Sequence, residues 1–93
     1  MKGTAEDRAY EKRARDLQYA RTVLRSTISA AEIIVIKTTI ATRQTEHLRR
    51  DLSHWHNAPH DKLREAVDIL NRLNGEATFL VNILKDAVAE CDQ

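Results

Sequence analysis

In the second half of the chain, apolar residues recur at alternating spacings of three and four. They are Leu63, Ala66, Leu70, Leu73, Ala77, Leu80, Leu84, Ala87 and Cys91. In a heptad lettered a to g, with Leu63 at a, these residues fill every a and d position, as in a coiled coil. Valines at 67, 81 and 88 add apolar e positions, and isoleucines at 69 and 83 add g positions. A stripe this wide predicts a helix packed in a bundle.

The first half follows the same repeat with smaller residues. Its predicted a and d positions are Tyr10, Arg13, Leu17, Ala20, Leu24, Thr27, Ala31, Ile34, Thr38, Ala41, Thr45, Leu48, Leu52 and Trp55. Alanine and threonine dominate this stripe, whereas leucine and alanine fill the other. We therefore expect the two helices to approach closely along these stripes, with large side chains opposite small ones.

Punctuating residues predict where the helices begin and end. Thr4 and Asp7 form an N-terminal capping pattern, and the stretch HWHNAPHD contains Asn57, a candidate cap, and Pro59, which is tolerated only in a first turn. We expect one helix over about 5–55, a turn over about 56–59 and a second helix over about 59–91. The fold prediction is an all-α, long antiparallel helical hairpin with coiled-coil-like heptads. Gly75 falls at an outward f position, so the second helix is expected to continue through it.

The stretch AEIIVIKTTIAT, residues 31–42, is unusually rich in β-branched apolar residues. As a helix it places Ile34 in the main stripe and leaves Ile33, Ile36 and Ile40 on the opposite face. The first helix is also longer than the second, so an N-terminal overhang projects with Tyr10 and Leu17 on it. The hairpin cannot cover these residues itself, and the sequence predicts a homodimer, a dimeric helical bundle in which a second copy covers them.

Two other architectures fit parts of the pattern. Ser29 followed by Glu32 forms a capping box, so a break near Ser26–Ser29 gives a monomeric three-helix bundle whose middle helix is buried on two sides. A strand over residues 33–40 that pairs between two chains is the other possibility. The continuous heptad phase favours the hairpin over both.

Composition narrows the class of protein. Ninety-three residues suit one small domain, and two glycines with one proline are too few for the many turns of a β-sandwich. There is no apolar run long enough to cross a bilayer and no hydrophobic stretch of a signal peptide, so we expect a soluble, cytoplasmic protein with no membrane partner. The single cysteine, Cys91, agrees with a reducing compartment.

Charge divides unevenly between the two halves. Residues 1–52 carry eleven Lys and Arg against seven Asp and Glu, and residues 53–93 carry four against seven. Nucleic-acid binding is therefore the alternative function, through a basic N-terminal helix. Its candidate contacts are Arg8, Lys12, Arg13, Arg15, Arg21 and Arg25. Acidic residues are interleaved among them, which favours a solvated helix surface instead.

Four histidines lie close together in sequence, and His54, His56 and His60 are the candidates for a metal site at the corner. Their spacing matches no zinc-site template, so we expect no metal and no cofactor.

No catalytic nucleophile has the sequence context that would activate it, and we expect no enzyme. The remote alternative is a small helical enzyme of chorismate-mutase-like architecture, an analogy of shape alone. Its candidate pocket residues are Arg25, Lys37, Glu46 and Arg50.

The leading hypothesis is a protein–protein interaction module that self-associates and presents helix surfaces to an unidentified protein, as an adaptor, inhibitor or assembly factor. The predicted interface consists of Tyr10, Leu17, Ile33, Ile36 and Ile40.

Overall fold

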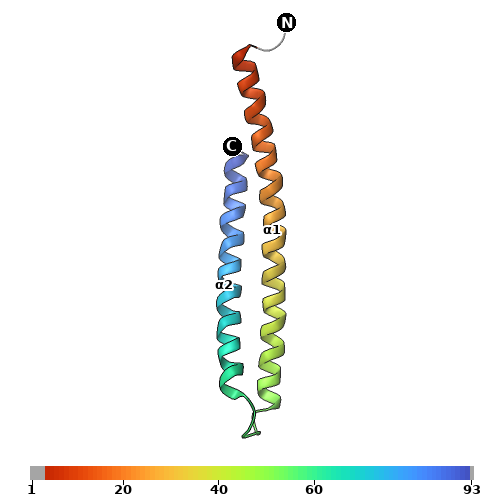
Figure 1. Ribbon diagram of the computed structural model, residues 1–93, viewed down its shortest axis with the longest axis vertical. Helices are drawn as coiled ribbons and strands as arrows, with labels where there is room; N and C mark the ends of the chain where they lie inside the picture. Colours follow the sequence, from red (N-terminus) through yellow and green to blue (C-terminus); the bar gives the residue numbers. More distant parts are fainter. Residues whose placement is uncertain (1–3, 93) are drawn as a thin grey trace.

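The computed structural model describes residues 4–92, and they form two long helices joined by one corner (Figure 1). Helix α1 spans Ala5–Asp51, and α2 spans His60–Cys91 and returns antiparallel beside it. The molecule measures 82 × 15 × 14 Å. The all-helical hairpin predicted from the heptads is confirmed, and the second helix runs through Gly75 as expected.

Several threonine side chains hydrogen-bond to the backbone of α1, and they do not interrupt the helix. At its start, Thr4 Oγ1 accepts a hydrogen bond of 3.1 Å from the Asp7 N–H, which confirms the predicted cap. Further along, Thr27 Oγ1 donates to the Val23 carbonyl at 2.8 Å, inside a continuous helix. Because hydroxyls in this segment bond back to the preceding turn, a Ser/Thr-rich stretch need not end the helix. The three-helix bundle and the strand over residues 33–40 are therefore both wrong.

The corner differs from its predicted form. Helix α1 ends at Asp51 rather than near residue 55, since the next residues close short turns, with the Trp55 N–H donating to the Leu52 carbonyl at 3.0 Å. Pro59, not Asn57, stands at the start of α2, and no side chain caps that end. Trp55, predicted to end the first stripe, is 56% exposed, so it does not fill the base of the hairpin.

The helices meet along their a and e positions rather than along a and d. The buried residues are Ile28, Ala31, Thr38, Val67, Ala77 and Val81. Three of them are a residues and three are e residues, whereas the d residues Ile34 and Leu80 remain about half exposed. The a positions were therefore predicted correctly and the d positions wrongly. The contact between two helices is narrow, so each helix can bury only two neighbouring columns of its heptad positions. In this hairpin those columns are a and e.

Asn74 occupies one of these e positions and joins the helices by hydrogen bonds. Its Nδ2 donates to the Val35 carbonyl at 3.0 Å, to Thr38 Oγ1 at 2.9 Å and to Thr39 Oγ1 at 3.0 Å. The half-buried amide fixes the level at which α2 lies beside α1.

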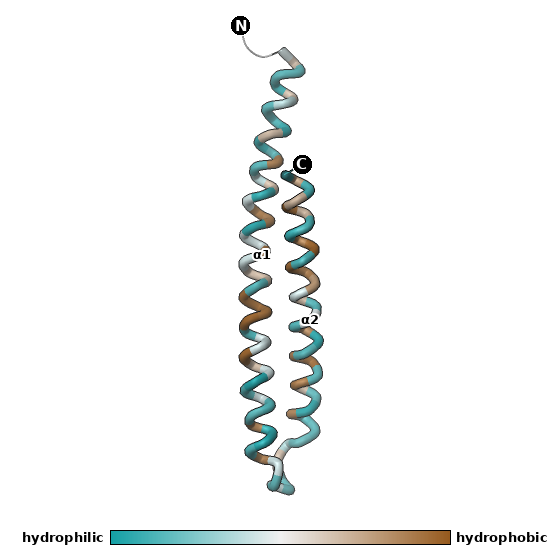
Figure 2. The backbone as a smooth tube through the Cα atoms, turned by 180° about the vertical axis from the view of Figure 1, so that it is seen from behind, coloured by the Kyte–Doolittle hydropathy of each residue, from teal (hydrophilic) through white to brown (hydrophobic). Residues whose placement is uncertain are grey.

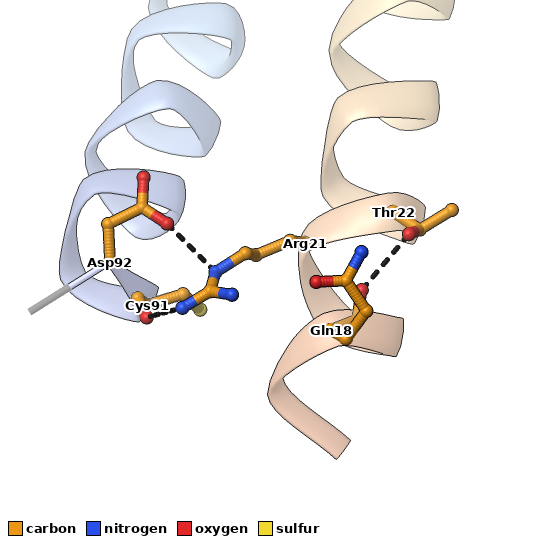
Figure 3. Close-up of polar contacts among 5 residues, drawn as sticks. All are labelled: Gln18, Arg21, Thr22, Cys91 and Asp92. Atoms are coloured by element: carbon orange, nitrogen blue, oxygen red, sulfur yellow. Dashed lines mark hydrogen bonds and ion pairs between the residues drawn. The ribbon is translucent and has the colours of Figure 1, made fainter. Parts of the chain in front are cut away.

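At the open end of the hairpin, α1 continues past the end of α2. Arg21 Nε lies 2.8 Å from Asp92 Oδ1, and Arg21 Nη2 donates to the Cys91 carbonyl at 2.8 Å (Figure 3). The fifteen-residue difference in helix length corresponds to an overhang of about 22 Å. Within the described residues, neither helix combines the length and apolar character needed to span a membrane.

A candidate protein interface on one side of the hairpin

Polar residues gather on one side of the hairpin. Lys85 Nζ of α2 lies 4.0 Å from Glu32 Oε2 of α1, and both residues line a shallow cavity together with Thr78. All three are b positions. The b columns of both helices therefore lie on the same side, as antiparallel pairing requires.

The d and g columns of both helices must then lie on the opposite side, because residues are spaced about 100° apart around a helix. Large apolar side chains occupy this side, which we call the open face. Its members are Val23, Ile34, Leu48, Ile69, Leu73, Leu80 and Ile83. The exposed fraction of each is between 43% and 49%, so the hairpin covers about half of each side chain and leaves the other half accessible.

The register of the hairpin makes the open face continuous. Asn74 lies level with Thr38, and Asp92 lies level with Arg21. In this antiparallel register, the residue numbers of two neighbours at the same level, one on α1 and one on α2, add up to about 112. At the d positions this sets Ile34 beside Leu80. The next two levels pair a leucine with an alanine: Ala41 with Leu73 and Leu48 with Ala66. The apolar surface therefore crosses both helices along the d positions. In Figure 2 the hydrophobic colour is concentrated in the middle of α1 and along α2, whereas the overhang and the corner are mainly hydrophilic.

Sequence reasoning missed the open face because it assigned four of the seven members, Ile34, Leu48, Leu73 and Leu80, to the internal seam. The signal that identifies the error is the row of valines at the e positions 67, 81 and 88. Apolar residues at a, d, e and g together require contact with two neighbouring helices, and the hairpin supplies one.

The residues predicted as the interface lie elsewhere. Ile33, Ile36 and Ile40 are 52%, 59% and 47% exposed and form a strip along α1, which we call the outer ridge. Ile33 and Ile40 face away from α2, whereas Ile36 borders the shallow cavity that Glu32 and Lys85 line. Tyr10 is exposed on the overhang, and Leu17 is half buried. The structure therefore does not bring the five residues together into one surface.

The predicted nucleic-acid residues also do not form one patch. Arg8, Lys12 and Arg15 share one face of the overhang and Arg13 lies on another, and an equal number of acidic residues over residues 5–20 balances the four. Arg21 is engaged by Asp92, and Arg25 lies on the polar side of the hairpin. Basic residues do converge at the corner, where Arg49, Arg50, His60 and Arg64 line one hollow together with Glu46 and Ser53.

In the part of the chain that the structure describes, the candidate metal ligands and the candidate pocket residues do not converge. In residues 4–92, no three His, Cys, Asp or Glu side chains gather as ligands, and His60 uses its ring to hydrogen-bond the Trp55 carbonyl. Of the candidate pocket residues, Glu46 and Arg50 share the corner hollow, whereas Arg25 and Lys37 do not line it.

The hairpin buries little of its surface for a chain of this size. Over the part of the chain that the structure describes, no large side chain is less than 2% exposed. The accessible surface is 7604 Å², whereas a compact monomer of the same mass exposes about 5,500 Å². The excess, about 2,000 Å², exceeds the roughly 800 Å² that each partner buries in an ordinary protein complex.

Searches of protein-family models, curated proteins and solved structures return no match to this chain.

Proposed function

We propose that this protein is a protein–protein interaction module that binds other helices through the open face. The supporting observation is the row of seven large apolar side chains that runs across both helices, each about half exposed. A helical partner laid over this row would bury it and complete a bundle around the a and d columns.

The physical argument is one of incomplete burial. Each buried Å² of apolar surface contributes roughly 25 cal/mol, and a contiguous exposed apolar surface is typical of binding sites. Since the hairpin's own seam is filled by small residues such as Ala31, Thr38 and Ala77, additional burial has to come from another chain. A module of this kind works as an adaptor, an inhibitor or an assembly factor rather than as an enzyme. We also propose a cytoplasmic location, in agreement with the free Cys91.

The outer ridge offers a second and narrower apolar surface for an unidentified protein. It lies outside the d and g columns, so a partner bound there does not compete with one on the open face. That the ridge or the overhang residues Tyr10 and Leu17 take part in self-association stays a prediction.

Site-specific photo-cross-linking in the native host tests the proposal. A benzophenone amino acid at Ala30, a g position within the open face, is expected to give adducts heavier than the single chain. The same probe at Asn71, a b position on the polar side, serves as the matched control and is expected to give few. If neither position yields adducts, the protein does not act through this surface.

Nucleic-acid binding stays a prediction as well. Retention on DNA or RNA would have to fall steeply with salt and depend either on the predicted contacts Arg8, Lys12 and Arg15 or on the corner arginines 49, 50 and 64. A protein that passes through such a column at low salt does not bind nucleic acid.

A further inference from the structure

We infer that the occupant of the open face is a second copy of this chain, bound with both corners at the same end of a four-helix dimer. This inference rests on the proposed function and names the partner that the open face fits. In the dimer, α1 of each copy lies across the open face from α2 of the other, and the two helices run antiparallel.

Symmetry fixes the register of this dimer. A two-fold axis parallel to the long axis of the hairpin keeps every residue at its own level. The levels that pair α1 with α2 within one chain therefore also pair α1 of one copy with α2 of the other. The apolar rows meet without sliding, with Ile34 of one copy level with Leu80 of the second.

Charge complementarity at the g positions favours this arrangement. In a bundle, e residues face one neighbouring helix and g residues face the other. Across the dimer, the same register sets Lys37 level with Glu76 and Asp51 level with Lys62, so both charged g pairs are opposite in sign. The remaining g levels pair Val23 with Glu90, Ala30 with Ile83 and Gln44 with Ile69, and no level brings like charges together.

The alternative two-fold axis places the corners at opposite ends and sets α1 over α1. If the open faces are centred on each other, that axis passes between the levels of Ile34 and Ala41. It then brings Lys37 against Lys37 of the second copy, and Glu76 against Glu76. Like charges directly opposed disfavour such pairing.

The same-end dimer also accounts for the overhang. Both overhangs leave the bundle at the same end and run parallel, and Tyr10 and Leu17 lie at a positions that continue the column pointing to the bundle axis. In the opposite-end arrangement each overhang projects alone. Over the length of the hairpin the heptad pattern is then used in full, with a and d at the centre, e within each hairpin and g between copies.

Analytical ultracentrifugation of the purified chain tests the identity of the occupant. We expect a dimer at micromolar concentration. Leu80→Glu places a charge in the apolar face and should weaken dimerisation at least about 100-fold. Phe79→Glu is the matched control, because Phe79 is the neighbouring large apolar residue, is 66% exposed and, at a c position, lies outside the d and g columns. It should leave the dimer intact.

Charge exchange tests the arrangement. Lys37→Glu converts two attractive contacts per dimer into two repulsive ones and should weaken dimerisation about tenfold, while the double change Lys37→Glu with Glu76→Lys should restore it. In the opposite-end dimer neither change alters the sign of any pair, so the single variant would match the parent chain.

Distances between spin labels give an independent reading. With Lys12→Cys labelled in a Cys91→Ala background, the same-end dimer brings the two labels within about 40 Å, whereas opposite ends place them roughly 75 Å apart at 1.5 Å rise per residue.

Two results would overturn the inference. One is a chain that sediments as a monomer at every accessible concentration. The other is a dimer that resists Leu80→Glu but dissociates with Ile36→Glu, which would move self-association to the outer ridge. The proposed function survives either result if the Ala30 probe still cross-links to another protein, so the two failures are distinguishable. Circular dichroism confirms that each variant keeps its helices.

Discussion

Asn74 provides the sharpest test of how the hairpin is held in register. Replacing it with alanine removes an amide that donates to the Val35 carbonyl and to the hydroxyls of Thr38 and Thr39. An amide has two N–H groups, so at most two of the three contacts count fully as hydrogen bonds. At about 0.5–1.5 kcal/mol each, their loss costs about 1–3 kcal/mol in the free energy of unfolding.

The partners left behind do not add a large penalty. Thr38 Oγ1 still donates to the Ile34 carbonyl at 2.8 Å, and Thr39 Oγ1 still donates to the Val35 carbonyl at 2.8 Å. Alanine also favours a helix over asparagine by about 0.6 kcal/mol, which partly offsets the loss. We therefore expect Asn74→Ala to lower the free energy of unfolding by about 0.5–2.5 kcal/mol.

Asn71→Ala is the matched control, because Asn71 is exposed on the same helix and its side chain makes no hydrogen bond to any of residues 4–92. It gains the same helix propensity without losing the network, so it should stabilise the protein slightly. Urea unfolding followed by circular dichroism, at one protein concentration for all variants, measures both changes. If Asn74→Ala proves as stable as Asn71→Ala, the network contributes nothing and the register has another origin.

The remaining predictions concern single features of the two helices. Gly75→Ala should raise the free energy of unfolding by about 1 kcal/mol in the same urea assay, because an added Cβ meets no atom within 4 Å; a loss of stability would mean that the helix is not regular there. Val81→Ala should lower the free energy of unfolding by about 2 kcal/mol, since Val81 packs with Ile28 and Ala31 in the core. Ile36→Ala should change the same free energy by less than about 0.5 kcal/mol, because Ile36 is exposed. Equal effects of the two changes would contradict the assignment of e as a buried column. Arg21→Ala should change global stability by less than about 1 kcal/mol, because its ion pair with Asp92 is partly exposed, yet it should speed amide hydrogen exchange in the last turn of α2; unchanged exchange would show that this contact does not hold the helix end.

The sequence by itself determined the class and most of the boundaries of the fold. Helical periodicity, one proline at the corner and a threonine cap require only local chemistry. The start at Ala5, the reversal near Pro59 and the passage of α2 through Gly75 follow from it. The corner was less predictable. Where α1 stops depends on how eight residues bridge two packed helices, and this is a tertiary constraint.

Only the tertiary structure decided which residues point inward. Both helices carry apolar residues at a, d, e and g, so several neighbouring pairs of columns were equally plausible as the seam. Pairing along a and e buries Ile28, Val67 and Val81 and lets Asn74 reach Thr38. The same choice leaves Ile34 and Leu80 open. A hairpin has one seam, whereas the sequence encodes a stripe wide enough for two. The local pattern therefore fixes how much apolar surface must be buried, and only the packing of whole helices determines which part of it a single chain can bury.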